Sequence, residues 1–234
     1  MKSENAIKYL KSISDKDRAE HLQRYFKTRK GEYGYKDKFL GITVPVLRKQ
    51  AKIYRGMPLS EILRLLRNEF HEVRLFSLLL LVDLFATSNE IMKEKISNLY
   101  LKNTRYINNW DLVDLSSRYI LGQWLFDKNR SILYKLAGSK SLWERRISVI
   151  STFYFISKKD FNDSLKIAHL LLYDKEDLIH KAVGWMLREI GNRDIKTEEV
   201  FLKKHYKKMP RTMLRYAIEK FPEARRKAYL MGKM

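Results

Sequence analysis

Apolar residues recur along most of this chain at intervals of three and four residues, the spacing that lines one face of an α-helix. The polar stretch Ser14–Asp17 separates two such segments near the N-terminus and predicts a cap between two helices. Thr43 and Pro45 predict the opening of a helix over 46–54. From residue 58 onward the helical spacing continues, and the alternation typical of strands is nearly absent. The pattern predicts an all-α protein.

Four similar windows, each the polar start of a strongly apolar helix, recur at a constant interval. Arg74, Trp110, Arg146 and Ala182 occupy one position in each window, and successive positions are 36 residues apart; another such start follows at Pro210. A repeat with room for two helices is typical of an α-solenoid, which stacks helix pairs and leaves a concave surface. We therefore predict one α-solenoid domain over 1–234, with a helical cap at about 1–56 and repeats at about 57–234.

The main irregular segment runs from Lys30 to Pro45 and holds three glycines. Its glycine spacing fits neither a Walker motif nor a dinucleotide-binding fingerprint, and no strand precedes it. Two interpretations stay open. Its Tyr and Lys side chains, Tyr35 among them, contact a nucleic-acid backbone, or the segment is a packed turn.

The composition adds a strong positive charge. Lys and Arg number 48 against 27 Asp and Glu, a formal net charge of +21 and a pI near 9.9. The excess indicates a polyanionic partner, either nucleic acid or an anionic membrane surface, although a basic protein without a specific partner is an alternative. Residues 193–234 alone hold 13 Lys and Arg against 5 acidic residues. That segment suits phosphate contacts or the solvated face of a capping repeat.

Several classes of chemistry are excluded or disfavoured. The chain has no Cys, which excludes disulfides, a thiol nucleophile and Cys-ligated metal. Its five His show no paired ligand spacing, so we expect no metal and no cofactor. The N-terminus lacks the apolar core of a signal peptide, and the longest apolar run, Leu75–Phe85, is too short to span a bilayer. We expect a cytoplasmic protein without membrane contact.

The segment Asn108–Arg118 holds the candidate chemistry. Asn109 is suited to cap a helix, on which Trp110 and Asp114 share one face and Arg118 lies a further turn along. An aromatic ring, a carboxylate and a guanidinium in one stripe serve either a core edge with an ion pair or the floor of a site.

The repeat spacing favours the site. In a solenoid, equivalent helix starts line up, so Trp110, Asp114, Arg146 and Trp185 are expected to come from three adjacent repeats and converge on one strip. A purely structural repeat would favour similar residues at these positions. These residues differ in type.

Five blocks resemble those of a known family. They look like the characteristic blocks of the AlkD-type DNA alkylation repair glycosylases, in the family's order over roughly residues 20–225. The Trp-Asp-Leu-Val-Asp and Gly-Trp-Met-Leu-Arg-Glu motifs are specific together and weak apart. The five blocks are Phe39–Pro45, Trp110–Asp114, Trp143–Arg146, His180–Glu189 and Met209–Ala217.

The resemblance implies HEAT-like repeats that hold double-stranded DNA in a basic concave groove. It further implies a monofunctional, metal-independent glycosylase that hydrolyses the N-glycosidic bond of cationic N3- and N7-alkylpurines in base excision repair. By motif, Asp114 would be the catalytic carboxylate, Trp110 and Trp185 would flank the lesion's sugar-phosphate, and Arg146 would support the carboxylate or a phosphate. Arg145 competes with Arg146, because only the Trp-x-x-Arg spacing distinguishes them.

DNA contacts are expected from basic side chains near these blocks. The resemblance implies a phosphate contact at Arg188, one turn beyond Trp185. We also expect contacts from Lys181, Arg145, Arg211, Arg215 and Tyr35. The protein is expected to act as a monomer. The Gly31–Lys38 insert departs from the family pattern.

The chemistry fits these residues independently. Glycosidic cleavage builds positive charge on the sugar, which a nearby carboxylate stabilises, and a cationic base leaves as a neutral one without a strong general acid. Indole faces also attract a cationic sugar or base. Two alternatives compete with the enzyme. One is a non-catalytic solenoid that binds damaged or distorted DNA, and the other is a protein-binding solenoid, which leaves the charge unexplained.

Overall fold

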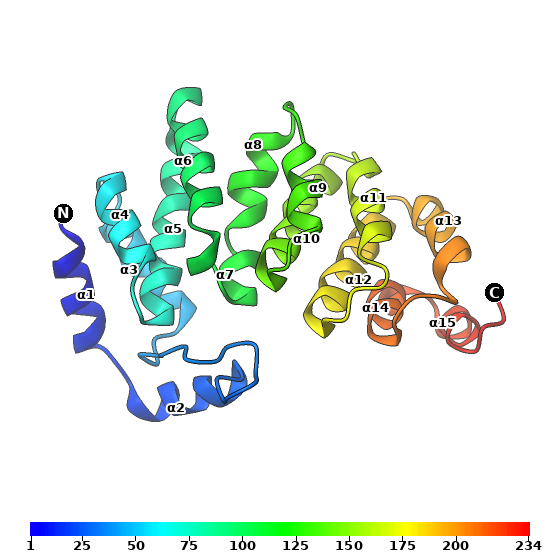
Figure 1. Cartoon of the computed structure of the whole chain (residues 1–234), viewed down its shortest axis with the longest axis horizontal. Coiled ribbons are helices and arrows are strands. Elements are labelled where there is room, and N and C mark those ends of the chain that lie inside the picture. The colour runs from blue at the N-terminus through cyan, green and yellow to red at the C-terminus, as the bar shows by residue number, and fades with distance from the viewer. The chain divides into compact units, whose positions relative to one another are not determined.

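The computed structural model describes residues 1–234 and divides into two compact units, 1–116 and 117–234, each described here by itself. Both units are helical, and the backbone forms no strand beyond an isolated parallel bridge between Lys38 and Phe70. The prediction of an all-α repeat fold is confirmed (Figure 1). A single solenoid domain with a concave basic groove stays a prediction. No helix is both long enough and apolar enough to cross a bilayer.

The first unit runs from the N-terminal helix to the short helix that carries the Trp-Asp-Leu-Val-Asp motif. Its elements are α1 (Ser3–Ser12), α2 (Lys16–Tyr25), α3 (Val44–Ile53), α4 (Leu59–Leu66), α5 (His71–Thr87), α6 (Glu90–Lys102), the 3-10 turn η1 (Thr104–Tyr106) and α7 (Trp110–Asp114).

The second unit begins with a π-helical turn, η2 (Arg118–Gly122), that leads directly into α8 (Gln123–Leu125). The elements that follow are α9 (Ser131–Ala137), α10 (Leu142–Ser157), α11 (Asn162–Leu170), α12 (Asp177–Gly191), α13 (Ile195–His205), α14 (Arg211–Ala217), the 3-10 turn η3 (Ile218–Lys220) and α15 (Glu223–Leu230).

Polar side chains fix many of the helix starts. Asp15 caps α2, Asn89 caps α6, Asn109 caps α7, Ser141 caps α10 and Asp194 caps α13, each by accepting from a backbone N–H of the first turn. These N–H groups have no partner within the helix, so the cap replaces water as their acceptor. The predicted caps, one within Ser14–Asp17 and one at Asn109, are confirmed.

The helix pairs repeat at a variable interval. Helices α5, α7, α10, α12 and α14 begin 39, 32, 35 and 34 residues apart, so the sequence interval of 36 is close to their mean. In the first unit, α5 packs against α3, α4, α6 and α7. In the second, α10 packs against α9, α11 and α12, and α12 packs in turn against α13 and α14. Each pair thus buries its apolar face against its neighbours.

A hydrogen bond inside the pairs gives the repeat register more closely. The Ser77 hydroxyl on α5 donates to the carbonyl of Ile62 on α4 over 2.7 Å. The Ser148 hydroxyl on α10 donates to the carbonyl of Leu133 on α9 over the same distance. Ser77 and Ser148 are therefore equivalent and 71 residues apart, whereas two sequence intervals of 36 predict 72. The predicted register is therefore wrong by one residue over these two repeats. The sequence windows are matched by residue type, whereas the hydrogen bonds show which residues are structurally equivalent.

Two glycines allow close approach of helical segments in the second unit, η2 to α10 and α12 to α14. A Cβ at Gly122 would lie 2.3 Å from the Ser151 carbonyl oxygen on α10. A Cβ at Gly184 on α12 would lie 2.5 Å from the Met213 carbonyl oxygen and 2.5 Å from the Tyr216 Cβ, both on α14. Real Cβ atoms do not tolerate such distances, so only glycine permits these helix contacts.

Candidate functional site

Helix α7 carries Trp110 and Asp114 at its two ends, both partly buried. The Asn109 side chain accepts from the Trp110 backbone N–H over 2.8 Å and fixes the start of the helix. The helix ends at Asp114, and Arg118 begins the π-helical turn η2 in the second unit, where its guanidinium lies 4.1 Å over the Phe153 ring. π-helical turns are frequent at functional sites.

A buried tyrosine lies close to Asp114. The Tyr100 hydroxyl on α6 is hydrogen-bonded to the Ser116 hydroxyl over 2.8 Å. Burial first, and then the negative charge of Asp114, raise the pKa of Tyr100. Tyr100 therefore stays neutral and acts as an apolar wall with one satisfied hydroxyl.

The indole of Trp110 is held by aromatic rings from α2 and the segment after it. It stacks on Phe26 with ring centroids 5.3 Å apart and an interplanar angle of 21°, and Tyr25 meets it edge-on at 6.2 Å. Phe26 stacks in turn on Phe39 at 5.1 Å. Such pairs add specific geometry to the burial of apolar area. The cluster therefore fixes the orientation of Trp110 on α7.

Behind this cluster lies a buried histidine between two carboxylates. His71 Nδ1 lies 3.0 Å from Asp37, and His71 Nε2 lies 2.8 Å from Asp111 on α7. Arg74 donates to the other oxygen of Asp37 over 2.6 Å. Phe26 and Phe39 cover the imidazole at 4.9 and 4.7 Å. The network ties α7 to the start of α5 and to the loop before α3.

The electrostatics of this network favour a charged imidazole. Burial lowers the pKa of His71, but the charge of Asp111 and the hydrogen bonds to Asp111 and Asp37 outweigh it and raise the pKa to about 9. Burial raises the pKa of Asp37, and the His71 hydrogen bond and the Arg74 charge more than offset this, so the pKa is lowered. At neutral pH, His71 is an imidazolium that donates from both ring nitrogens.

A second buried carboxylate clamps the loop itself. Glu72, 2 % exposed on α5, accepts from the backbone N–H groups of Leu40, Gly41 and Ile42 over 2.8, 2.8 and 3.3 Å. These residues belong to the Phe39–Pro45 block. One side chain thus satisfies three buried donors that the loop cannot satisfy within itself. The clamp places Phe39 against His71.

The Lys30–Pro45 segment is a packed turn whose tip stays exposed. Asp37 points into the His71 network, and the Gly34 N–H donates to the carbonyl of Lys27 over 3.0 Å. Tyr35 is 50 % exposed, and the Lys36 ammonium lies 5.3 Å from its ring centroid. The segment is therefore held by contacts within the first unit, and a DNA contact at Tyr35 stays a prediction.

The His71 network gives the protein a defined pH dependence. A folded-state pKa of about 9 against 6.5 unfolded means that the stabilisation is complete below pH 6.5 and lost as pH rises through about 9. We expect His71→Gln to lower the free energy of unfolding at pH 6 by about 3 kcal/mol more than at pH 10. Urea unfolding across this range measures the difference. His21→Gln, at an exposed histidine, is the control, and parallel curves for His71→Gln and wild type contradict the network.

In the second unit, Arg146 and Trp185 lie on neighbouring helices. Arg146 on α10 is 5 % exposed, and one nitrogen of its guanidinium donates to the Leu178 carbonyl on α12 over 2.5 Å. Trp185 on α12 meets Phe153 edge-on at 5.5 Å, and its indole N–H donates to Glu189 over 3.2 Å. Both side chains are held in place by α10 and α12.

Arg145 has a structural role that the sequence did not reveal. Its guanidinium donates to the carbonyls of Ser139 and Lys140, both over 3.0 Å, and to Asp174 over 2.6 Å. Arg74 makes the same pair of bonds to the two loop carbonyls before α5. Arg145 is therefore the repeat equivalent of Arg74, 71 residues on, and holds the loop that precedes its helix.

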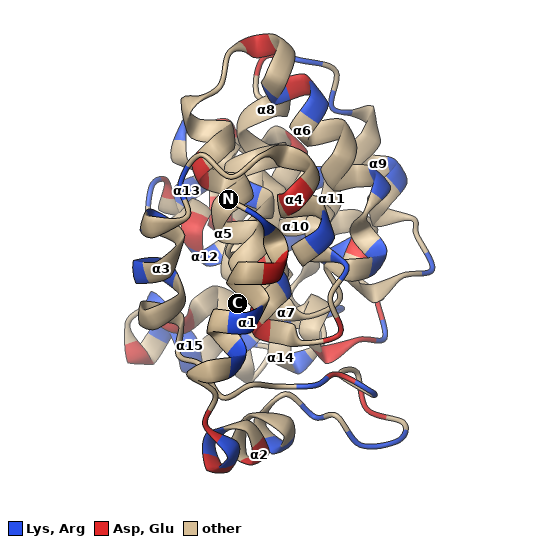
Figure 2. Cartoon of the chain, turned by 90° about the vertical axis from the view of Figure 1, so that its left-hand side faces the viewer, with Lys and Arg blue, Asp and Glu red and all other residues tan.

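The remaining predicted DNA contacts lie on α12 and α14. Lys181 pairs with Asp177 over 2.8 Å, and Arg188 forms an ion pair with Glu219. Arg211 and Arg215 are exposed on α14, where Arg211 donates to the Leu230 carbonyl over 2.7 Å. Lys and Arg also occur on helices of both units, α2, α3 and α15 among them (Figure 2). DNA contacts at these residues stay predictions.

Sequence reasoning missed the supporting residues Asp37, His71 and Glu72. The available signal is His71-Glu72-x-Arg74, a polar cluster at the start of an otherwise apolar helix. The partners are 30 to 40 residues away, so local spacing gives no indication of them.

The chain is similar to known proteins along almost its whole length. The sequence model described as "DNA alkylation repair enzyme" matches residues 6–221. A solved structure from Enterococcus faecalis, described as a predicted DNA alkylation repair enzyme, has a TM-score of 0.67 at 17% identity and covers 90% of this chain and 97% of its own. AlkD2 from Streptococcus mutans gives 0.56 at 15% identity, over 89% and 99%. The smu.31 protein of Streptococcus mutans UA159 gives 0.53 at 15%, over 94% and 99%. No curated protein matches.

Proposed function

The chain belongs to the DNA alkylation repair enzyme family, and on that premise we propose that it is a monofunctional DNA glycosylase. It hydrolyses the N-glycosidic bond of cationic N3- and N7-alkylpurines in double-stranded DNA, as a step of base excision repair. One observation supports the proposal most directly. Helix α7 carries both Asp114 and Trp110, and it is anchored by the Asp111–His71 hydrogen bond and by the stacking of Trp110 on Phe26. A carboxylate held this firmly is preorganised to stabilise developing positive charge.

The reaction needs little besides that carboxylate. As the bond between C1′ and the purine nitrogen breaks, its electron pair returns to the base and cancels the positive charge of the alkylated ring. The sugar takes on oxocarbenium character, which Asp114 stabilises, and water adds to C1′ and loses a proton. Because the base leaves neutral, neither a strong general acid nor a metal is required in this scheme.

The other site residues act through DNA. Trp110 and Trp185, both partly buried on rigid helices, offer indole faces to the lesion's sugar-phosphate or a cationic sugar. Arg146 is the preferred site arginine, because Arg145 is bound to loop carbonyls and Asp174. The burial of Arg146 favours a supporting role over an open phosphate contact.

Phosphate contacts are proposed for the basic side chains of α12 and α14. Exposed Arg211 and Arg215 suit this role directly, whereas Lys181 and Arg188 would exchange a carboxylate partner for a phosphate. Tyr35 adds an exposed ring at the loop tip. We propose that the protein acts as a monomer, in the cytoplasm and without a cofactor.

Single-turnover release of 7-methylguanine from a duplex oligonucleotide tests the proposal. Asp114→Asn keeps the shape and removes the charge, so we expect release to fall about 10²-fold or more while DNA affinity is retained. Asp127→Asn, at an exposed aspartate of the second unit, is the control and should match wild type. If wild type releases no base yet binds DNA tightly and in a salt-sensitive way, the chain is a DNA-binding module and not a glycosylase.

A further inference from the structure

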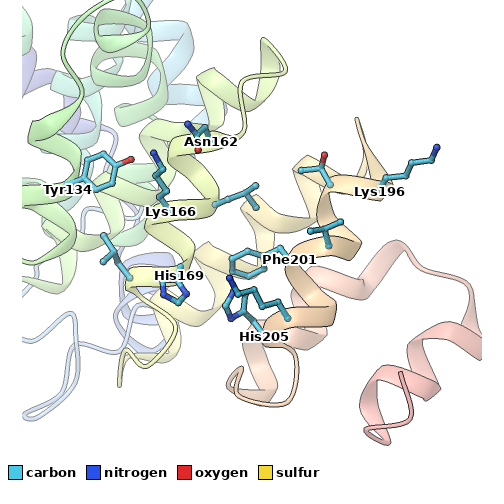
Figure 3. A pocket seen from close by; sticks show the side chains of 12 residues that line it. Tyr134, Asn162, Lys166, His169, Lys196, Phe201 and His205 are labelled. Atoms are coloured by element: carbon cyan, nitrogen blue, oxygen red, sulfur yellow. The ribbon is translucent and has the colours of Figure 1, made fainter.

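An open groove of about 710 Å³ lies on the second unit, and none of the site residues proposed above lines it. It runs between α11 and α13 and reaches Tyr134 on α9. Lys166 and His169 stand on its α11 side, and Phe201 and His205 face them from α13 (Figure 3). All these helices belong to one unit, so the groove is a feature of that unit alone.

The floor of the groove is apolar and accessible. Leu170 on α11 is 57 % exposed and Val200 on α13 is 71 % exposed, and Leu165 and Phe201 also line the groove. Single exposed apolar residues are common on protein surfaces. Apolar residues that line one groove from two helices are different, because such a patch is typical of an interaction site.

The rim of the groove is positive. Lys166, Lys196 and Lys204 line it, and no Asp or Glu does. Asp163, close to the α9 end, is bonded to Arg130 and to the Tyr134 hydroxyl, so its charge is compensated. The unit as a whole carries 26 Lys and Arg against 13 Asp and Glu.

The acidic residues of α13 are turned away from the groove. Glu198 is 1 % exposed, and Glu199 pairs with Arg225 on α15 over 2.5 Å. Lys166 lies near Asp163 and Lys196 lies near Asp194, but neither carboxylate lines the groove. An apolar floor with a lysine rim and no acidic lining is complementary to a ligand with an apolar face and acidic flanks.

We propose that this groove docks an acidic amphipathic helix of a protein partner. A groove between two helices accepts a third helix that inserts apolar side chains at helical spacing, while its Asp and Glu meet the lysine rim. A second copy of this chain is disfavoured as the occupant, because two molecules of net charge +21 repel each other. DNA gains nothing from Leu170 and Val200, since phosphates need donors.

The C-terminal segment of this chain is not the occupant. Tyr206 directly follows α13, and its hydroxyl donates to the carbonyls of Gly232 and Met234 over 3.1 and 2.6 Å. These bonds hold the last residues against Tyr206, which does not line the groove. The proposal does not depend on glycosylase activity, since it concerns a different surface and a different ligand.

Fluorescence anisotropy with a designed probe tests the proposal. The probe is a labelled synthetic helical peptide with Leu along one face and Glu along the other; the control peptide has the same composition with the Leu positions scrambled. We expect the probe to bind and the scrambled peptide to bind at least about tenfold more weakly. Equal affinity for the two peptides, or no binding of the probe, overturns the proposal.

Protein variants then locate the site. Val200→Asp, which places a charge on the groove floor, should weaken probe binding at least about tenfold. Val46→Asp, at a 38 % exposed valine on α3, is the matched control and should have no effect. Lys166→Glu combined with Lys204→Glu should also weaken the probe at least about tenfold, with affinity for a duplex oligonucleotide unchanged. If that double variant loses DNA affinity as strongly as peptide affinity, the groove belongs to a DNA-binding surface and the proposal fails.

Discussion

Glu72→Ala should lower the free energy of unfolding by about 4 kcal/mol, the largest effect expected of any single substitution in the first unit. The change removes the acceptor of three backbone N–H groups, those of Leu40, Gly41 and Ile42. Each buried donor left unpaired costs about 1–3 kcal/mol, and a cavity at a 2 % exposed position adds to this. Urea unfolding at neutral pH measures the loss.

The same variant should disturb the aromatic cluster. Without the clamp, Phe39 is no longer fixed against His71, and the stack from Phe39 through Phe26 to Trp110 loosens. Near-UV circular dichroism should lose intensity under conditions where the far-UV spectrum shows the helices intact. Glu69→Ala is the control, because the Glu69 side chain forms an exposed ion pair with Lys38, and exposed ion pairs add little to stability. Equal destabilisation by the two variants contradicts the clamp.

Gly184→Ala should destabilise the second unit by about 3 kcal/mol. In an exposed helix interior the same change normally stabilises by up to about 1 kcal/mol, because alanine is the better helix former. At Gly184 the added methyl would lie 2.5 Å from the Met213 carbonyl oxygen, so α14 must move away from α12. Trp185 and the Arg188–Glu219 ion pair lie beside this contact and should shift with it.

Gly138→Ala supplies the matched control for this prediction. A Cβ at Gly138 meets its nearest neighbours at 3.7 and 3.8 Å, ordinary contact distances, and the residue has a negative φ. Its thermal unfolding midpoint should stay within a few degrees of wild type, whereas that of Gly184→Ala should fall by about 6 °C or more. A Gly184→Ala protein as stable as wild type would show that the α12–α14 contact adjusts at little cost.

Local sequence signals predicted the local features of this fold. Asp15, Asn109 and Pro45 each lie at or next to a helix start, because capping and the fixed φ of proline act within one turn. The repeat was visible as recurring polar starts of apolar helices. Its register was wrong by one residue over two repeats, since the hydrogen bonds of Ser77 and Ser148, invisible in the sequence, define it.

The candidate site was only partly predictable for the same reason. Trp110 and Asp114 were identified as sharing one helix, and their catalytic roles rest on family resemblance and stay proposals. Asp111 lies in the first turn of α7, and its side chain contacts His71, 40 residues away, which local spacing does not indicate. The groove between α11 and α13 was not predicted at all, because an exposed Val200 in a sequence looks like any surface valine.

The Asp37–His71–Asp111 network also bears on the order in which the chain folds. Its hydrogen bonds join residues 34 and 40 positions apart, and the Leu40–Glu72 bond spans 32, whereas the Ser77–Ile62 bond inside a helix pair spans 15. Closing longer loops costs more chain entropy, and contacts of greater sequence separation form more slowly. Helix pairs should therefore assemble before the loop docks on α5. Until that last step the chain has its repeats but no fixed Trp110, so the proposed active site is completed later than the fold.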